Sequence, residues 1–380
     1  MSLRVLHVSD VYLPRLGGLE MQVHDLTLQQ ARAGHDVRLV TATSELTGRI
    51  SQWAADVGPP GVDVLRTGRA VGVSWHEVLE HRPDVVHCHV SVVSPMAWSA
   101  ARAATRAGLP VVVTMHSMLS PSGAVATLWR YIASAVGEVT WTAVSHVAAS
   151  SLSQVIQAPV AVLPNGIDPG QWTHATPAGQ SIPTIVAVMR LARRKRAVEL
   201  IDVLAALRDR TPGVPWRAVI AGDGPGSGAV RRAVRRHDLQ ERTSLVGRLT
   251  RPEVARLLAA SDVFVAPAHL ESFGIAALEA RCAGLPVVAM RHGGVAEFVS
   301  DGRDGYLVGS DEELTARLAE LVRDLPALRQ MGVELRRRPV PLAWPLVVRN
   351  CDRVYAEAGA GPAPKARESA AGDHLAFSML

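Results

Sequence analysis

Residues 262–288, DVFVAPAHLESFGIAALEARCAGLPVV, decide the fold of this chain. Residues 263–266 are apolar and lie between an aspartate and a proline, which predicts a short buried strand. Ser272 stands where a helix N-cap is expected, and residues 273–283 are apolar around most of their circumference, which predicts a buried helix. A glycine and a proline then end this helix, and two valines begin a second apolar strand.

Two carboxylates interrupt this apolar stretch, Glu271 before the predicted helix and Glu279 inside it. A buried carboxylate is costly unless other groups donate hydrogen bonds to it. The backbone N–H groups of Phe273, Gly274 and Ile275 are expected at the helix N-terminus, where they could bind an anion. The stretch therefore suits a ligand that carries both phosphate and hydroxyl groups.

The residues alone leave an alternative open, because a capped core helix in which Glu279 pairs with Arg281 or a more distant arginine would show the same pattern. The spacing Glu-x7-Glu around Ser-Phe-Gly, followed by Ala-Gly-Leu-Pro-Val-Val, resembles the family-4 retaining glycosyltransferases (glycosyl transferases group 1). Pro-Asn-Gly-Ile-Asp at 164–168 supports the resemblance, which covers about residues 3–357. It implies the α/β fold called GT-B: two Rossmann-like, doubly wound parallel-sheet domains facing a central cleft, with a C-terminal helix crossing back to the first.

Composition is that of an ordinary globular protein of 380 residues, with 48% hydrophobic and 20% charged residues. A net charge of +5 suits small anionic ligands but is too weak to indicate nucleic acid. Three widely spaced cysteines, Cys88, Cys282 and Cys351, fit a reducing compartment. We see no secretory signal and no 18-residue apolar run, so we expect a cytoplasmic protein.

Strand-like and helix-like segments alternate through both halves of the chain, which predicts parallel sheets covered by helices. The expected boundaries are an N-terminal acceptor-side domain at 1–168, a linker at 169–182, a C-terminal nucleotide-sugar-binding domain at 183–340, a returning helix at 341–358 and a disordered tail at 359–380.

The first half offers a glycine pair and three histidines that are candidate site residues. Gly17 and Gly18 follow the first strand but lack the full dinucleotide fingerprint, so NAD is disfavoured; the resemblance implies that they touch the donor diphosphate. His87 and His89 share one face of a predicted strand, and a metal site there is an alternative without a further ligand cluster. His116 follows the next strand. The sequence favours a loop histidine, whereas the resemblance implies a cleft histidine near the donor sugar.

The second half carries a basic run after its first predicted strand. Arg190 stands at the strand end and Lys195 follows five residues later. A solvated basic loop is the simpler interpretation, but the resemblance implies that these two residues neutralise the donor diphosphate, without need of Arg193, Arg194 or Arg196.

Two further turns are assigned by the resemblance. Gly-Asp-Gly-Pro at 222–225 is expected as a structural turn near the nucleotide, because its proline removes an N–H that a phosphate loop would use. Arg248 and Leu249 are expected beside the base, and Gly293-Gly294 matches a family loop.

The chemistry follows from these residues and the resemblance. The sequence contains no Asp-x-Asp pair to hold a divalent metal, so we expect no metal and no cofactor, the pyrophosphate being stabilised by cations and amides. We expect a hexosyltransferase that retains anomeric configuration and uses a UDP- or GDP-sugar and a hydroxyl acceptor (a glycan, lipid or small metabolite). Glu279 would bind the ribose, Glu271 the sugar hydroxyls, and His116 the donor sugar or the acceptor.

Rival hypotheses are a sugar-nucleotide epimerase of the same architecture and a non-catalytic nucleotide-sugar binder. Four arginines on one predicted helix are interpreted either as a solvated face, which we favour, or as a peripheral contact with the inner face of the cell membrane; they are Arg231, Arg232, Arg235 and Arg236. The sequence does not indicate an oligomeric state.

Overall fold

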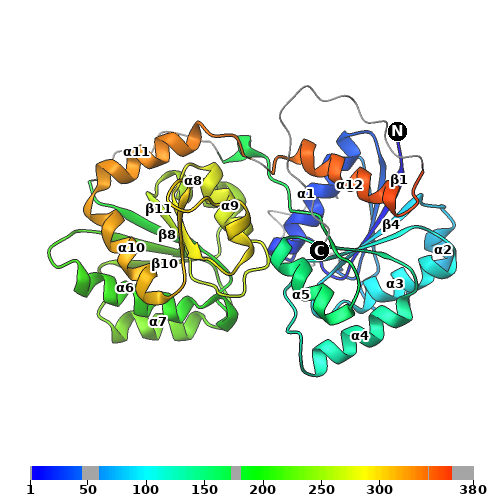
Figure 1. Ribbon diagram of the computed structural model, residues 1–380, viewed down its shortest axis with the longest axis horizontal. Helices are drawn as coiled ribbons and strands as arrows, with labels where there is room; N and C mark the ends of the chain where they lie inside the picture. Colours follow the sequence, from blue (N-terminus) through cyan, green and yellow to red (C-terminus); the bar gives the residue numbers. More distant parts are fainter. Residues whose placement is uncertain (1, 45–59, 173–180, 341, 362–380) are drawn as a thin grey trace. The chain divides into compact units, whose positions relative to one another are not determined.

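The computed structural model divides the chain into two compact units (Figure 1). Unit 1 comprises Met1–Gly166 and Leu342–Leu380, and unit 2 comprises Ile167–Pro341. The residues that the structure describes are 2–44, 60–172, 181–340 and 342–361, so most of the predicted tail and linker lies outside them.

Unit 1 is built on a seven-stranded parallel sheet in the order β3-β2-β1-β4-β5-β6-β7. Helices α1 and α12 cover one face, and α3, α4 and α5 cover the other (Figure 1). Its strands are β1 (Arg4–Ser9), β2 (Asp36–Thr41), β3 (Val62–Arg66), β4 (Val85–Val90), β5 (Val111–Met115), β6 (Thr140–Ala143) and β7 (Ala161–Val162). Its helices are α1 (Gly18–Arg32), α2 (Trp75–Leu79), α3 (Pro95–Arg106), α4 (Ala124–Val136), α5 (His146–Ile156) and α12 (Trp344–Glu357).

Unit 2 repeats this plan with a six-stranded parallel sheet in the order β10-β9-β8-β11-β12-β13. Its strands are β8 (Thr184–Val188), β9 (Arg217–Ala221), β10 (Thr243–Gly247), β11 (Val263–Ala266), β12 (Val287–Met290) and β13 (Gly305–Val308). Its α-helices are α6 (Ala197–Arg210), α7 (Ser227–Arg236), α8 (Arg251–Ala259), α9 (Ile275–Cys282), α10 (Asp311–Arg323) and α11 (Leu325–Arg336). Three short 3-10 helices join these elements: η1 (Pro169–Gln171), η2 (Arg193–Lys195) and η3 (Gly294–Glu297).

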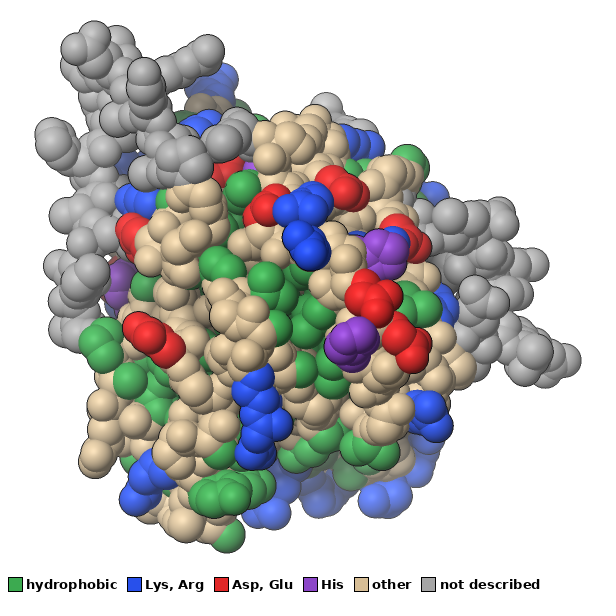
Figure 2. Space-filling view, turned by 90° about the vertical axis from the view of Figure 1, so that its right-hand side faces the viewer, with side chains coloured by type: hydrophobic (Ala, Val, Ile, Leu, Met, Phe, Trp, Pro, Cys, Tyr) green, Lys and Arg blue, Asp and Glu red, His purple; other side chains and the backbone are tan. Residues whose placement is uncertain are grey.

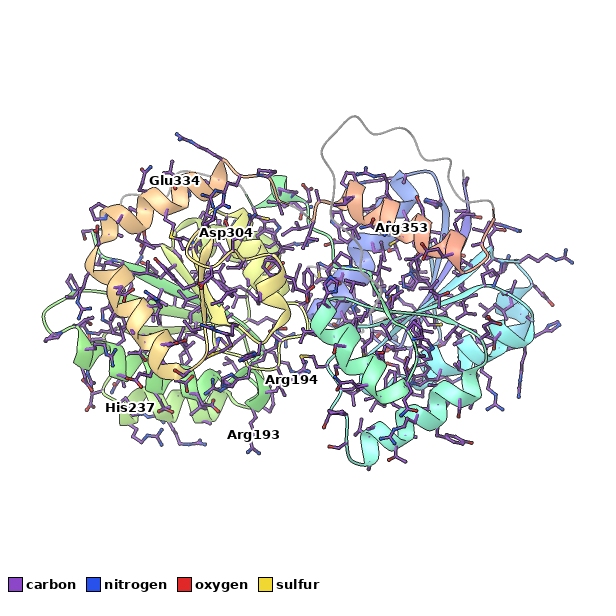
Figure 3. All side chains as sticks on the ribbon, viewed as in Figure 1. Arg193, Arg194, His237, Asp304, Glu334 and Arg353 are labelled. Carbon is purple, nitrogen blue, oxygen red and sulfur yellow. The ribbon has the colours of Figure 1, made fainter. Side chains whose placement is uncertain are left out.

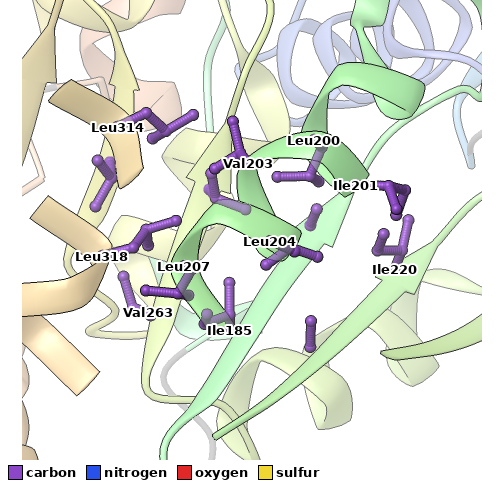
Figure 4. Close-up of a cluster of buried hydrophobic side chains, with 14 of the residues drawn as sticks. Ile185, Leu200, Ile201, Val203, Leu204, Leu207, Ile220, Val263, Leu314 and Leu318 are labelled. Carbon is purple, nitrogen blue, oxygen red and sulfur yellow. The ribbon is translucent and has the colours of Figure 1, made fainter. Parts of the chain in front are cut away.

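The core of unit 2 lies where α6 and α10 pack against the sheet. Leu200, Leu204 and Leu207 point from α6 towards the strands and are fully buried, and Leu314 and Leu318 of α10 meet them (Figure 4). Burying each such leucine contributes about 1.5–3 kcal/mol relative to exposure. Both sheets are parallel and covered by helices, so the fold class predicted from the alternating sequence pattern is confirmed.

Two elements were missed in the weakly patterned stretch 42–80. Strand β3 is an edge strand with partly exposed residues, so it lacks the continuous apolar run of a central parallel strand. Helix α2 has only five residues, of which Trp75 and Val78 are buried, and is too short to show helical periodicity. Residues 45–59 of this stretch lie outside the described part.

The last helix returns to the first unit, as predicted. Trp344 and Val347 of α12 are buried against Val5 and Leu163 of unit 1. Gly166 lies so close to the Trp344 ring that a Cβ at this position would overlap it. The C-terminal segment is thus part of the core of unit 1.

Replacing the α12 anchor tests this packing. Trp344→Ala should lower the free energy of unfolding of unit 1 by about 3–5 kcal/mol, because it leaves a large cavity. Urea unfolding followed by circular dichroism measures the change. Arg353→Ala is the control: this exposed residue of α12 (Figure 3) forms a surface ion pair with Glu357 at 3.9 Å and should contribute less than about 1 kcal/mol. Equal destabilisation by both substitutions would contradict the anchoring role.

Candidate functional site

The candidate site of unit 2 lies at the carboxyl ends of β8 and β11. These adjacent strands mark the point where the strand order reverses, since the chain continues from β8 to β9 on one side and from β11 to β12 on the other. Ligands in open parallel sheets bind at such a reversal point. The loop after β8 carries Arg190 and Lys195, and the loop after β11 carries Glu271.

An ion pair joins these two loops. Lys195 Nζ donates to Glu271 Oε2 at 2.5 Å, and the two side chains are 21% and 16% exposed. Water screens such a partly buried pair less than a surface pair, so the pair places one positive and one negative group in a defined position. The two predicted catalytic residues are therefore neighbours.

The helix beside Glu271 begins later than predicted. We expected residues 273–283 to be helical with Ser272 as N-cap, but α9 begins at Ile275 and its N-cap is Gly274. Gly274 has φ +94°, a left-handed conformation that a helix cannot contain and that favours glycine. Its carbonyl accepts from the N–H groups of Ala277 and Leu278. Phe273 and Gly274 thus belong to the preceding turn, and Ile275 is the first helical residue.

The glycine pair after β12 packs against this turn. Gly294 N donates to the Glu271 carbonyl at 2.8 Å. A Cβ at Gly294 would lie 2.5 Å from the Ser272 carbonyl oxygen and 2.8 Å from Phe273 Cα, closer than real Cβ atoms approach. Gly294 therefore lets the backbone around Glu271 be held by a direct hydrogen bond.

The Gly-Asp-Gly-Pro turn supports the other loop, as the sequence predicts for a structural turn. Leu191 N donates to the Asp223 carbonyl at 3.0 Å, and Gly226 N donates to the Leu191 carbonyl at 2.7 Å. Gly222 has φ +137°, and a Cβ there would overlap the Met189 carbonyl oxygen. Because this backbone lies against the segment around Arg190, it is a scaffold for that segment.

The remaining basic residues of the loop divide by their contacts. Arg190, Arg193 and Arg194 are exposed, the last two near the edge of unit 2 (Figure 3). Arg196 instead forms a bidentate pair with Asp311, at 2.9 and 2.7 Å, and also donates to the Pro267 carbonyl. Arg196 therefore holds the loop to the unit 2 scaffold, a structural role that the sequence did not predict.

Three further residues that were predicted to bind the donor lie in unit 2. Glu279 is partly buried in α9, and Arg281 on the same helix pairs with Asp304 at 3.5 Å, so the predicted alternative pairing with Glu279 is not formed by Arg281. Arg248 is exposed and Leu249 half-buried just after β10. The positive charge of Arg248 helps to lower the pKa of Asp223, after hydrogen bonds to that carboxylate from Ser227 and Gly224.

The glycine pair of unit 1 has a carboxylate beside it. Gly17 is the N-cap of α1, and Glu20 in the first turn lies so close that a Cβ at Gly17 would overlap its carboxylate. Arg15 pairs with Glu20 at 3.1 Å. A phosphate near Gly17 and Gly18 would therefore meet a negative group, which weakens the anion site that their position suggests.

Histidines of unit 1 gather on β1 and β4 and directly after β5. His87 and His89 share one face of β4, as predicted, and His7 of β1 joins them; sequence reasoning missed His7 because a lone histidine in an apolar strand gives no signal. His116 follows β5, with Nε2 3.1 Å from His89 Nδ1. Burial lowers the pKa of His7 and of His116 to about 4, so both rings are neutral at pH 7.

This cluster bears on the metal alternative. Ligand atoms of His7, His87 and His89 lie within 4.8 Å of one another, the one such group of three in the described ranges. Both ring nitrogens of each already have a hydrogen-bond partner in the protein, namely His89 and Gln30 for His7, Tyr355 and Thr114 for His87, and His7 and His116 for His89. The geometry thus favours a hydrogen-bonded cluster.

An acidic neighbour balances part of the positive charge of α7. The arginines of α7 are exposed, but Arg236 lies 3.7 Å from Asp202, which also pairs with His237 at 2.8 Å. On the face shown in Figure 2, acidic, basic and histidine side chains lie close together. None of the helices in the described part of the chain combines the length and the apolar composition that a membrane span requires. Membrane contact stays a prediction.

Comparison with known proteins gives two family matches. Residues 16–171 match the model "Glycosyltransferase Family 4", and residues 174–338 match "Glycosyl transferases group 1". The glycogen synthase of Mycobacterium tuberculosis is 30% identical over 403 residues, covering 94% of this chain and 96% of that protein. The D-inositol 3-phosphate glycosyltransferase of Pseudarthrobacter chlorophenolicus is 29% identical over 406 residues, covering 90% and 91%.

Among solved structures, the Anabaena protein HepE in complex with UDP has the same fold. Its TM-score is 0.73 at 19% identity, over 93% of this chain and 100% of that one. The two-sheet architecture derived above is therefore shared with this protein.

A glycine substitution tests the packing around Glu271. Gly294→Ala should destabilise unit 2 by about 1–3 kcal/mol, because the added methyl group overlaps the backbone of residues 272 and 273. Thermal unfolding measures the loss. Gly309→Ala is the matched control, since a Cβ there has only ordinary contacts, 3.6 Å or longer. A Gly294→Ala protein as stable as this control would show that the close approach is not required.

Proposed function

Because the chain belongs to glycosyltransferase family 4, we propose that it moves a hexose from a UDP- or GDP-linked donor to a hydroxyl acceptor, with retention of configuration and without a bound metal. That it is a glycosyltransferase follows from the family. The nucleotide, the stereochemistry and the metal independence are the proposal. The observation that carries the binding of a nucleotide sugar by protein groups is the Lys195–Glu271 pair.

This pair suits the two parts of a nucleotide sugar. A pyrophosphate leaving group gains negative charge as its bond to the sugar breaks, so a cation placed beside it stabilises the transition state more than the ground state. Lys195 supplies that cation, and the exposed Arg190 on the same loop can supply a second. Glu271 can accept hydrogen bonds from sugar hydroxyls next to them, and Glu279 from the ribose.

The backbone at the start of α9 adds to the positive potential of this proposed phosphate site. The N–H of Ile275 lies at the helix N-terminus, where the helix dipole favours an anion. Gly274 in the preceding turn carries no side chain that would keep a phosphate away from the backbone. Together with an absence of Asp-x-Asp from the sequence, this supports charge stabilisation by protein groups.

The low pKa of His116 supports one feature of the mechanism. A group with a pKa of about 4 is too weak a base to hold the acceptor's proton at pH 7. We therefore propose that the leaving phosphate oxygen takes the acceptor's proton; that the acceptor attacks on the same face from which the phosphate departs is what the resemblance to retaining enzymes implies. His116 then binds and orients a substrate group.

The relatives support the substrate classes. HepE was crystallised with UDP and with UDP-glucose, and the names of the two curated relatives indicate hydroxyl-rich acceptors, glycogen and an inositol phosphate. We propose the same classes here: a UDP-type donor and a carbohydrate or polyol acceptor.

Substitution of the ion pair tests the assignment. Lys195→Ala and Glu271→Ala should each lower kcat by about 10²-fold to 10³-fold at saturating donor, because each removes an interaction made in the transition state. Arg193→Ala and Arg194→Ala, exposed on the same loop, are the controls and should stay within about threefold. Transfer from a panel of UDP-, GDP- and ADP-sugars to polyol acceptors is measured by nucleotide release. Near-normal turnover in both variants would reject the proposal.

Chelation tests the metal independence. Activity should be unchanged in EDTA, because Lys195, Arg190 and backbone amides supply the positive potential. Loss of activity that Mg²⁺ or Mn²⁺ restores would contradict this. Incubation with the nucleotide sugar alone, followed by analysis of the sugar, would reveal an epimerase instead by conversion of the donor without any acceptor.

A further inference from the structure

Exposed apolar side chains gather on unit 1, where α4 meets the loop between β4 and α3. In the described part of the chain nine large apolar side chains are exposed, and five of them lie here, with exposed fractions from 36% to 73%. We call these five the apolar patch; they are Val92, Val93, Val125, Leu128 and Tyr131. The Trp129 indole N–H donates to the Val92 carbonyl at 3.1 Å, which holds the loop to α4. Single exposed apolar residues are ordinary, whereas a cluster marks an interaction surface.

The exposed half of α4, at the lower margin of unit 1 in Figure 1, is itself divided into two stripes. Val125, Leu128 and Tyr131 follow one another at three-residue spacing, and the partly buried Ile132 continues this apolar stripe. A polar stripe lies beside it, made of Thr127, Arg130 and Ser134. The opposite side of α4 is buried against unit 1, so the apolar stripe is additional to what that packing uses.

The hydroxyl groups of the polar stripe already donate to their own helix. Ser134 Oγ donates to the Tyr131 carbonyl at 2.8 Å, and Thr127 Oγ1 donates to the Gly123 carbonyl at 3.4 Å. A protein–protein interface usually carries about one hydrogen bond per 100–200 Å². This surface has few donors left for such bonds, whereas a hydrocarbon layer requires none. The occupant that it suits better is therefore a lipid surface.

The charge around the patch is entirely positive. Residues 85–137 contain no aspartate or glutamate, although the chain has 35 of them in 380 residues. Helices α3 and α4 pack together through the rings of Trp98 and Trp129, whose centroids are 4.7 Å apart. The exposed charged residues of these two helices are Arg102, Arg106 and Arg130. Cations beside exposed apolar side chains complement a lipid surface that carries negative headgroups.

Helix α7 offers similar charge without apolar residues beside it. Its exposed residues are Arg231, Arg232, Arg235 and Arg236. Binding to a lipid surface grows with the apolar area that is buried, and electrostatic attraction adds to it. Of the two helices, α4 therefore has both contributions, whereas α7 has one.

We propose that the apolar patch docks unit 1 onto an anionic lipid surface, with Leu128 and Tyr131 entering the headgroup layer and Arg130 contacting lipid phosphates. The loop at 91–94 leaves the carboxyl end of β4, and α4 follows β5, so docking would hold this edge of the sheet close to the headgroups. Lipid binding needs neither a nucleotide sugar nor an acceptor. The proposal therefore stands apart from the proposed function, and its failure would leave the glycosyltransferase assignment untouched.

Vesicle sedimentation with the full-length protein tests the docking. Vesicles of equimolar phosphatidylcholine and phosphatidylglycerol should bind the protein at least about tenfold more tightly than vesicles of phosphatidylcholine alone, because the arginines near the patch attract anionic lipid. Added salt should weaken this preference, since it screens the attraction. Absence of binding to the anionic vesicles at low salt would overturn the proposal.

Apolar substitutions test whether the patch makes the contact. The double variant Leu128→Ser/Tyr131→Ser should lower affinity for the anionic vesicles by about tenfold or more, because its apolar area is lost. The control is Leu65→Ser/Val71→Ser, at residues of unit 1 that are 43% and 66% exposed outside the patch, and it should stay within about twofold. Circular dichroism checks folding, and Val93→Ser replaces the double variant if that protein unfolds. Equal affinities of the patch variant and the control would overturn the proposal.

Charge substitutions decide between the two helices. Arg130→Ala on α4 should lower affinity for the anionic vesicles by about fivefold, as expected for one arginine near a charged lipid surface. Arg235→Ala on α7 is the matched control and should leave the affinity unchanged. A larger loss from Arg235→Ala would place the contact on α7 and overturn the proposal.

Sedimentation velocity without lipid tests the remaining occupant, a second copy of this chain. The distribution of species should be the same in the unsubstituted protein and in the Leu128→Ser/Tyr131→Ser variant. Self-association that this double substitution abolishes would assign the patch to a contact between copies and overturn the proposal.

Discussion

The ion pair between Lys195 and Glu271 joins two loops that lie 76 residues apart in the chain. It exists because β8 and β11 are neighbours in the sheet, where the order of strands reverses. Parallel strands bring their carboxyl ends to one edge, so loops that are distant in sequence meet there. The chemistry proposed for unit 2 depends on this meeting.

Two glycines allow these loops to pack closely against neighbouring backbone. Gly222 lies against the Met189 carbonyl and Gly294 against the backbone at Ser272, and a side chain at either position would push a loop away. Arg196 fixes the loop after β8 from another direction through its bidentate pair with Asp311. The residues that bind the ligand in the proposal are therefore few, whereas the residues that hold them are spread over the loops after four strands.

Unit 1 uses the corresponding edge of its sheet differently. There His7, His87 and His89 are buried, burial lowers the pKa of each ring, and their hydrogen-bond partners are one another and uncharged side chains. Neutral side chains that are joined by hydrogen bonds avoid the desolvation cost of a buried ion. Tyr355 shows why α12 belongs to unit 1, since its hydroxyl joins His87 to Gln30 in the hydrogen-bonded histidine cluster.

The sequence by itself determined the fold class, because buried parallel strands and amphipathic helices leave distinct periodic patterns, as at 184–188 and 311–323. It also determined the family, since Glu271, Glu279 and the glycines between and after them form a specific local motif. Local patterns did not reveal the start of α9, where Gly274 takes a left-handed conformation, or edge strand β3, whose residues are partly exposed.

Only the tertiary structure decided the contacts between distant residues. His7 and Gln30 carry no signal in the sequence, and they gain a role because β1 and α1 place them between His89 and Tyr355. The pairing of Arg281 with Asp304 and of Arg196 with Asp311 was equally hidden. The physical reason is the same in each case: periodicity records which face of an element is buried, whereas a hydrogen bond or an ion pair depends on the position of a partner elsewhere in the chain.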